Sequence, residues 1–108
     1  MQVIGRGRGV GDRHAMGTLR VIESRREFDS IQRGEIVLLW QPDSELVLWL
    51  DRVSAIISRS GGTTAHLALI AMEAGIPYFV LHEELEPLAT GDLVFVNTDT
   101  GEISRSAP

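Results

Sequence analysis

Short apolar runs, separated by polar residues and glycines, extend along most of this chain. Runs of about four to eight residues have the length of strands, and a run without polar interruption indicates a strand buried on both faces. On this basis we predict strands at Gly17–Ser24, Glu35–Trp40, Ser54–Ser58, Tyr78–Leu81, Asp92–Asn97 and Glu102–Ser104. The glycine-rich residues 1–16 do not show this pattern, and we predict that they form an irregular, flexible leader.

Helices are expected between the central strands. Pro42–Asp51 is predicted to be a helix because proline is well tolerated in a first helical turn. Thr64–Ala74 is predicted to be a second helix, ended by Gly75. Arg26–Arg33 forms either a polar connection or a short helix, and Glu83–Thr90 a loop with some helical character.

The order of strand, helix, strand, helix and strand in the middle of the chain is typical of crossover units on a largely parallel sheet. A turn at Gly101 instead indicates a hairpin at the C-terminal end. We therefore predict one α/β domain with both parallel and antiparallel strand pairing.

Composition narrows the class of protein. The 108 residues suffice for one small domain, and a formal charge of −5 disfavours nucleic-acid binding. The chain has no cysteine and no apolar run long enough to cross a bilayer, and it begins without the apolar core of a signal peptide. We expect a cytoplasmic protein. Arg6, Arg8 and Arg13 form a local basic patch that is interpreted as a solvated segment.

Residues 60–77 (SGGTTAHLALIAMEAGIP) carry the most chemical information. Gly61 and Gly62 allow the backbone to turn sharply or approach a ligand closely, and Thr63 or Thr64 can cap the helix that follows. His66 then falls in the first helical turn, next to amides that have no partner within the helix. The rest of this helix is apolar nearly all round and is expected to be buried.

The positive end of a helix is a poor place for a cation and a good place for an anion. We expect it to favour an uncharged His66 imidazole, whose free nitrogen is a nucleophile, and to stabilise the oxygens of a phosphoryl group bound there. A surface or capping role is the alternative interpretation of this histidine, and spacing alone does not exclude it.

The segment Gly61–Gly62–Thr63–Thr64–Ala65–His66, followed by an alanine-containing helix and Gly75–Ile76–Pro77, resembles the motif of the mobile domain of phosphoenolpyruvate-utilising enzymes. The resemblance covers about residues 9–105. It implies a three-layer β/β/α swivelling domain in which His66 is the phosphoryl acceptor and Thr64 helps to hold it. It also implies that Gly61, Gly62, Thr63 and Ala65 surround the phosphate.

The resemblance further implies a division of labour. The chain itself would bind no cofactor or metal. ATP, phosphoenolpyruvate and magnesium would bind to partner chains, namely an ATP-grasp nucleotide-binding domain, a phosphoenolpyruvate/pyruvate barrel, or both. Met72 stands where the family usually has an arginine, and Leu67 and Leu81 also depart from its pattern. Two alternatives to a phosphoryl carrier are therefore retained: an interaction or regulatory module with the same fold, and the small swivelling subunit of a dehydratase.

Other candidate features are interpreted structurally. The glycines of residues 5–11 do not have the spacing of a dinucleotide-binding loop. His14 and His82 lack partners at metal-ligand spacing and are expected at the surface. The acidic run of Glu83, Glu84 and Glu86 is expected to be a solvated loop. Trp40 and Trp49 are predicted to lie in the core.

Overall fold

Seven strands and three helices make up the part of the chain that the computed structural model describes, which is residues 1–11, 14–63 and 65–106. The α-helix is α1 (His66–Glu73), and the 3-10 helices are η1 (Arg25–Ser30) and η2 (Ser44–Arg52). The strands are β1 (Gln2–Val10), β2 (His14–Ile22), β3 (Glu35–Leu39), β4 (Val53–Ser58), β5 (Tyr78–Glu84), β6 (Leu93–Asn97) and β7 (Glu102–Arg105).

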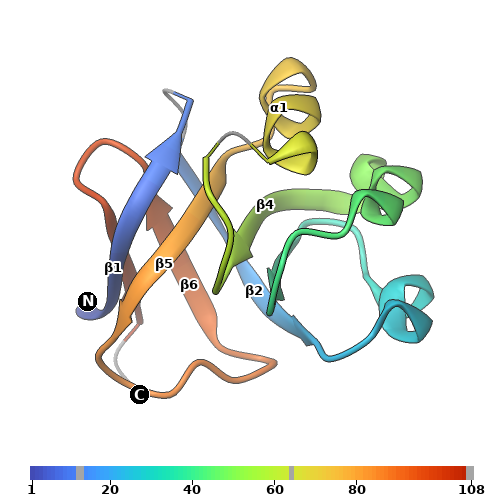
Figure 1. The fold of residues 1–108 in the computed structure, drawn as a ribbon. Coiled ribbons are helices and arrows are strands. Elements are labelled where there is room, and N and C mark those ends of the chain that lie inside the picture. Colours follow the sequence, from blue (N-terminus) through green and yellow to red (C-terminus); the bar gives the residue numbers. More distant parts are fainter. Residues whose placement is uncertain (12–13, 64, 107–108) are drawn as a thin grey trace.

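The strands form a mixed sheet that closes into a barrel in the order β1-β5-β4-β3-β2-β6-β7 (Figure 1). Strands β2, β3, β4 and β5 are parallel neighbours, as the crossover pattern predicts. The C-terminal hairpin of β6 and β7 is antiparallel, also as predicted. The mixed α/β fold is thus confirmed. The three-layer arrangement is not confirmed, because the strands close into one barrel.

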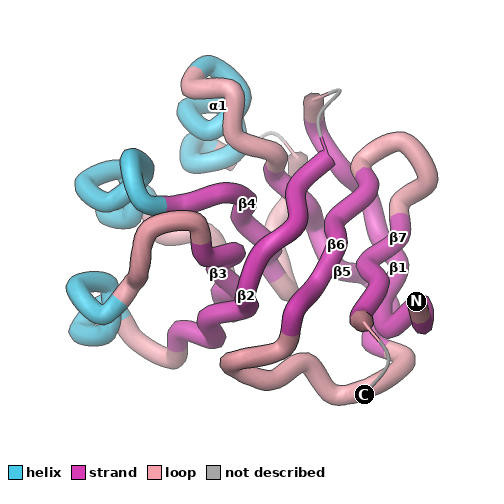
Figure 2. The backbone as a smooth tube through the Cα atoms, turned by 180° about the vertical axis from the view of Figure 1, so that it is seen from behind, coloured by secondary structure: helices cyan, strands magenta, loops and turns pink. Residues whose placement is uncertain are grey.

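Two cores result from the alternation of side chains along the parallel strands. On β3, Ile36 and Leu38 belong to a cluster to which all seven strands contribute, and this cluster fills the barrel. Val37 and Leu39 point the other way and pack with residues of α1, η1 and η2. The helices lie on one side of the barrel only, as the view from behind also shows (Figure 2). Burial on both faces explains the uninterrupted apolar run from which this strand was predicted.

The prediction of an irregular segment over residues 1–16 is wrong. Strand β1 pairs with both β5 and β7, and β2 already begins at His14. Gly5, Gly7 and Gly9 recur with the period of a strand, and a Cβ built at Gly7 would lie 1.9 Å from the carbonyl oxygen of Val80. Glycine is needed here because the neighbouring backbone approaches too closely for any side chain. Arg13 of the predicted basic patch lies outside the described residues.

The connection between β3 and β4 is helical, as predicted, but it is a 3-10 helix capped by Asp43 rather than one begun at Pro42. The Asp43 carboxylate accepts hydrogen bonds from the Glu45 amide and from the Arg25 guanidinium. Burial acts to raise the pKa of Asp43, but these hydrogen bonds outweigh it and the pKa is lowered. Arg25 and Asp43 thereby join the N-terminal ends of η1 and η2.

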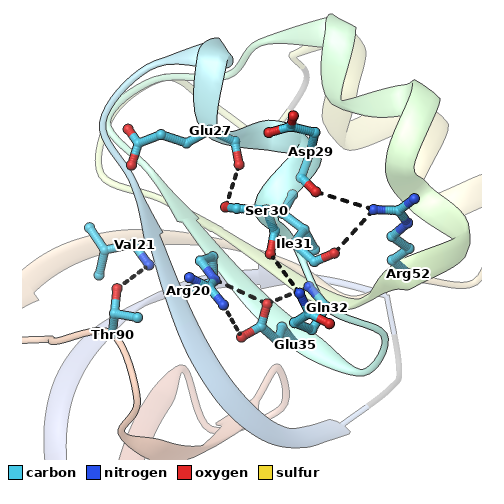
Figure 3. Close-up of polar contacts among 10 residues, drawn as sticks. All are labelled: Arg20, Val21, Glu27, Asp29, Ser30, Ile31, Gln32, Glu35, Arg52 and Thr90. Atoms are coloured by element: carbon cyan, nitrogen blue, oxygen red, sulfur yellow. Dashed lines mark hydrogen bonds and ion pairs between the residues drawn. The ribbon is translucent and has the colours of Figure 1, made fainter.

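A nearly buried carboxylate holds the turn that leads into β3. Both oxygens of Glu35 accept hydrogen bonds of 3.1 Å from Arg20 on the neighbouring strand β2, and one also accepts the Gln32 amide at 2.6 Å (Figure 3). Glu35 is 7% exposed. Bidentate geometry and low exposure make this pair stronger than an ordinary surface ion pair.

Glu35→Gln is expected to lower the free energy of unfolding by about 2 kcal/mol, because it removes the charge that Arg20 and the Gln32 amide both stabilise. Urea denaturation followed by circular dichroism measures this change. Glu83→Gln is the matched control, since Glu83 is exposed on β5 and should change stability by less than about 0.5 kcal/mol. Equal effects of the two substitutions would contradict a structural role for the Glu35 pair.

Candidate functional site

The predicted site lies on the connection between two parallel strands. After β4 ends at Ser58, residues 59–63 run back along the barrel towards α1, and α1 then leads to β5 (Figure 1). This crossover places His66 at the first position of the only α-helix among the described residues.

The base of this loop is fixed to the ends of the strands beside it. The Arg59 amide donates to the Leu39 carbonyl at 2.9 Å, and the Ser60 hydroxyl donates to the Trp40 carbonyl at 2.6 Å. The guanidinium of Arg59 lies 4.5 Å from the centre of the Trp40 ring and 3.1 Å from the Glu84 carboxylate. These contacts tie the loop to β3 on one side and to β5 on the other.

Gly61 continues this anchoring in a way that only glycine permits. Its φ is +85°, and a Cβ built there would lie 2.8 Å and 2.9 Å from the Cγ and Cδ atoms of Pro42. The loop therefore rests directly on the segment that follows β3. The sequence predicts glycine here for close approach to a ligand or for positive φ, and the structure shows the latter together with a close protein contact.

Helix α1 begins at His66 and has Ala65 as its N-cap residue. Alanine cannot cap with its side chain, so the predicted threonine cap does not occupy the N-cap position. The Leu69 amide makes the first hydrogen bond within the helix, 3.1 Å to the Ala65 carbonyl. The amides of His66, Leu67 and Ala68 precede it and have no acceptor within the helix.

The end of α1 agrees with the sequence prediction. The Gly75 amide donates to the Met72 carbonyl, and the Ile76 amide donates to the Ala71 carbonyl. These two hydrogen bonds form a Schellman motif with Gly75 at φ +76°.

The prediction that the whole helix is buried is wrong, because Leu69 is 43% and Met72 46% exposed.

His66 is exposed, and no described residue forms a hydrogen bond or ion pair with its side chain. An imidazole in this setting is open to a reactant from outside the domain. Gly61 and Gly62 are exposed, whereas Thr63 and Ala65 are half-buried. Thr64, the second predicted catalytic residue, lies outside the described residues. Gly61, Gly62 and His66 are thus exposed on the same crossover, and the phosphate-binding roles of the loop residues stay predictions.

A buried phenol lies beside the loop. Tyr78 on β5 is fully buried, and its hydroxyl makes no hydrogen bond of normal geometry with any described residue. Burial raises the pKa of Tyr78, and the nearby Ser58 hydroxyl opposes this only in part. The Ser58 hydroxyl donates instead to the Ser60 carbonyl at 2.6 Å, at the start of the loop. The Ser58 side chain is thus bound to the loop rather than to Tyr78.

Other surface features lie apart from His66. A pocket of about 560 Å³ opens where β2 and β3 end, and residues 22–25, 28 and 39–44 line it, so His66 lies outside it. Within it, Arg25 pairs with Asp43, and the Glu23 carboxylate accepts a hydrogen bond from the Trp40 indole. No group of three side chains suited to hold a metal occurs among the described residues. His14 and His82 are exposed, as predicted. Nor does any described helix combine the length and apolar character needed to cross a membrane.

Comparison with protein families shows to which family the chain belongs. Residues 31–101 match the family described as PEP-utilising enzyme, mobile domain, where PEP is phosphoenolpyruvate. The chain belongs to this mobile-domain family. The matched range includes the loop, His66 and all of α1, so the resemblance stated from the motif is confirmed.

Curated relatives of this mobile domain are phosphoenolpyruvate synthases. The enzyme of Deinococcus radiodurans is 38% identical over 101 residues, which are 93% of this chain and 13% of the relative. The enzyme of Aquifex aeolicus is 38% identical over 104 residues, or 94% of this chain and 12% of the relative. The chain therefore spans about an eighth of the length of these relatives, and they contain other domains.

Solved structures share the fold at lower identity. A UPF0107 protein solved by NMR superposes with a TM-score of 0.70 and 22% identity, covering 94% of this mobile domain and 98% of that protein. Aconitase X of Thermococcus kodakaraensis gives a TM-score of 0.58 and 18% identity, covering 97% of this domain and 98% of that chain. At such identities the comparison shows a common fold alone.

The residues that hold the loop base were missed by sequence reasoning. Trp40 was predicted to be in the core but is 56% exposed and stacks with Arg59. Trp49 is only partly buried and packs on the helix-side core. The contact of Arg59 with Glu84 joins residues 25 positions apart and has no local sequence signal. Glu83 and Glu84 lie on β5 rather than in a loop.

Gly61→Ala is expected to lower the free energy of unfolding by more than Gly91→Ala does. Both glycines have positive φ, which costs a side-chain-bearing residue about 1–2 kcal/mol. Only at Gly61 does the added Cβ also meet Pro42, whereas nothing lies within 4 Å at Gly91. Chemical denaturation of the two variants measures the difference, and equal losses would contradict the close packing of the loop on Pro42.

Tyr78→Phe is expected to raise the free energy of unfolding at neutral pH by about 1 kcal/mol, because it removes a buried hydroxyl without a partner. Tyr78 is the only tyrosine, and its pKa is raised above the ordinary value of 10.0. The raised pKa favours the neutral phenol in the folded state. The free energy of unfolding therefore keeps its full value below pH 10 and falls as the pH rises through the higher folded pKa, since only the unfolded chain ionises readily. Denaturation between pH 8 and pH 11 should show this loss in the wild type but not in Tyr78→Phe. A marked destabilisation by the substitution would instead indicate a hydrogen-bond partner.

Proposed function

We propose that this mobile domain is a phosphoryl carrier, phosphorylated on His66, which relays the group between a nucleotide site and a phosphoenolpyruvate/pyruvate-type site elsewhere. The observation that supports this most directly is the position of His66. It is an exposed imidazole without a described partner at the first position of α1, inside the range that matches the PEP-utilising family.

The proposed chemistry requires one nucleophile and stabilisation of charge. A nitrogen of the His66 imidazole attacks the phosphorus of the donor, so that an N–P bond forms and the donor's P–O bond breaks. The leaving oxygen keeps the electron pair. In the second transfer an acceptor oxygen attacks the same phosphorus and the N–P bond breaks, which returns the imidazole unchanged.

The residues around His66 would stabilise the bound phosphoryl group. The first amides of α1 point out of the helix start and can donate to its oxygens. Thr63, Thr64 and the backbone of Gly61, Gly62 and Ala65 would complete the surroundings. The anchored base of the loop would keep this geometry fixed between transfers, and preorganisation of this kind is what charge stabilisation requires.

The carrier would need partners for both transfers. We assign ATP, phosphoenolpyruvate and magnesium to an ATP-grasp nucleotide-binding domain and a phosphoenolpyruvate/pyruvate barrel, whether these lie on separate chains or in one longer protein. The curated relatives are phosphoenolpyruvate synthases of which this domain is about an eighth, in agreement with such partners. Because it would use ATP and phosphoenolpyruvate, we expect the proposed reaction to take place in the cytoplasm.

A second candidate is an interaction or regulatory module that keeps the fold without phosphoryl transfer. Helix α1 contains no basic residue in its last turn, and Met72 occupies an exposed position there. Without a cation on α1, part of the phosphoryl charge would have to be balanced by the helix amides or by a partner. Labelling of His66 separates the two functions.

His66→Ala is expected to abolish phosphorylation of the domain. The purified chain is incubated with phosphoenolpyruvate, or with ATP and magnesium, together with an extract of cells that express it. Intact mass spectrometry under alkaline conditions, which preserve phosphohistidine, should show one added phosphoryl group on the wild type. His82→Ala is the control, because His82 is also exposed but lies on β5.

Two results would contradict the proposal. Labelling that persists in His66→Ala would place the phosphoryl group on another residue. No labelling of the wild type with either donor would favour the interaction module.

A further inference from the structure

The glycines of β1 show which way the arginines between them point. A Cβ built at Gly7 would lie 2.8 Å from the ring carbon Cε1 of Phe79, a residue of the cluster that fills the barrel. Gly7 therefore faces the inside of the barrel. Because successive side chains of a strand point to opposite faces, its neighbours Arg6 and Arg8 point outwards, and both are exposed.

Arg8 lies on the same outer face as the core beneath α1. Val10, two positions further along β1, packs against the cluster that includes Leu67 and Ala68 of α1. Val80 of β5 is the residue directly opposite Arg8, and it belongs to the same cluster. Arg8 therefore borders the part of the core that the first turn of α1 covers.

The loop that leads to His66 starts in line with Arg8. Ser58, the last residue of β4, pairs with Val80, so that Ser58, Val80 and Arg8 stand in one row across three neighbouring strands. Residues 59–63 continue from this row, and in both views they lie between the C-terminal end of β1 and helix α1 (Figures 1 and 2). The side chain of Arg8 thus stands on the side of the loop opposite α1.

The guanidinium of Arg8 is available to bind an anion, since no described residue forms a hydrogen bond or ion pair with it. Arg6, by contrast, lies 3.9 Å from the Glu102 carboxylate, and Arg59 is paired with Glu84 at 3.1 Å. Helix α1 itself contains no lysine or arginine. Arg8 is therefore an unpaired cation on the side of the barrel where α1 begins.

We propose that Arg8 binds the phosphoryl group that His66 carries. Two N–H groups of its guanidinium donate to two phosphoryl oxygens, because the planar fork of arginine matches phosphate in this bidentate way. The first amides of α1 donate to the same group from the other side of the loop. This inference rests on the proposed function and adds to it the residue of this domain that supplies the positive charge.

The test compares an anionic reagent with an uncharged one at the same imidazole. With phosphoramidate, an N–P bond forms at His66, the P–N bond of the reagent breaks, and ammonia leaves with the proton that the imidazole loses. With diethyl pyrocarbonate, an N–C bond forms at His66, a C–O bond of the reagent breaks, and carbon dioxide and ethanol are released. Only the first reaction places negative charge beside Arg8.

Arg8→Gln is expected to slow the phosphoramidate reaction of His66 about tenfold, because a charge-assisted contact with the phosphoryl oxygens is lost. The same substitution should leave the diethyl pyrocarbonate reaction unchanged, since that reagent brings no anion to the site. Mass spectrometry of the peptide that contains His66 measures both rates, under alkaline conditions for the phosphorylated form.

Arg6→Gln is the matched control, since Arg6 lies on the same strand and the same outer face but is near Glu102 and farther from Val10. It removes the same charge, and both of its rates should equal those of the wild type. Arg8→Lys keeps a charge without the planar fork and should recover part of the phosphoramidate rate. Circular dichroism checks that the variants remain folded.

Three results would overturn the role of Arg8 and leave the proposed function standing. The first is an equal phosphoramidate rate in the wild type and Arg8→Gln. The second is equal slowing by Arg6→Gln, which would reduce the effect to net charge. The third is slowing of both reagents by Arg8→Gln, because the arginine would then shape the loop rather than bind the phosphoryl group.

The wild type itself separates the two proposals. If phosphoramidate does not label its His66 but phosphoenolpyruvate or ATP with cell extract does, the domain has no anion site of its own and the role of Arg8 is refuted. If none of these donors labels His66, the proposed function fails as well.

Discussion

The burial of β3, β4 and β5 on both faces is the constraint on which the rest of the structure depends. Their alternate side chains fill either the barrel or the space beneath the helices, so a shift of one residue in register would exchange the two cores. The pairing of Leu39 with Ser58 is thereby fixed. Because the loop that leads to His66 starts at Ser58, the position of the site follows from how these strands pack.

Among the described residues of the loop, Arg59 and Ser60 at its base make the side-chain contacts with neighbouring elements. Arg59 bonds to Leu39, stacks on Trp40 and pairs with Glu84, while the side chain of His66 has no described partner. The proposed carrier would have to accept a group at one site and release it at another. A side chain held by partners of its own would have to break those contacts at each transfer. Anchoring the base alone keeps the loop in place and leaves the imidazole available.

Much of the fold could be predicted because its signals are local. The apolar run of Glu35–Leu39 and the glycine that ends α1 each depend on residues close in sequence, and both predictions are correct. Strand β1 was missed because glycine is a poor indicator of strands, and its reason for being there is the backbone of β5, about 70 positions away. Closure of the sheet into a barrel likewise depends on pairing between β1 and β7 at the two ends of the chain.

The same distinction between local signals and contacts of distant residues applies to the candidate site. A short motif identifies His66 and Gly61, but the exposure of Leu69 and Met72 follows from how α1 lies on the barrel and contradicts an apolar helix being wholly buried. Arg20, Arg25 and Arg59 are each paired with a carboxylate on another element, so these cations stabilise the domain. Helix α1 has no basic residue in its last turn. A phosphoryl group on His66 would add negative charge to an already acidic domain, and the helix amides, Arg8 or a cation of a partner would have to balance it.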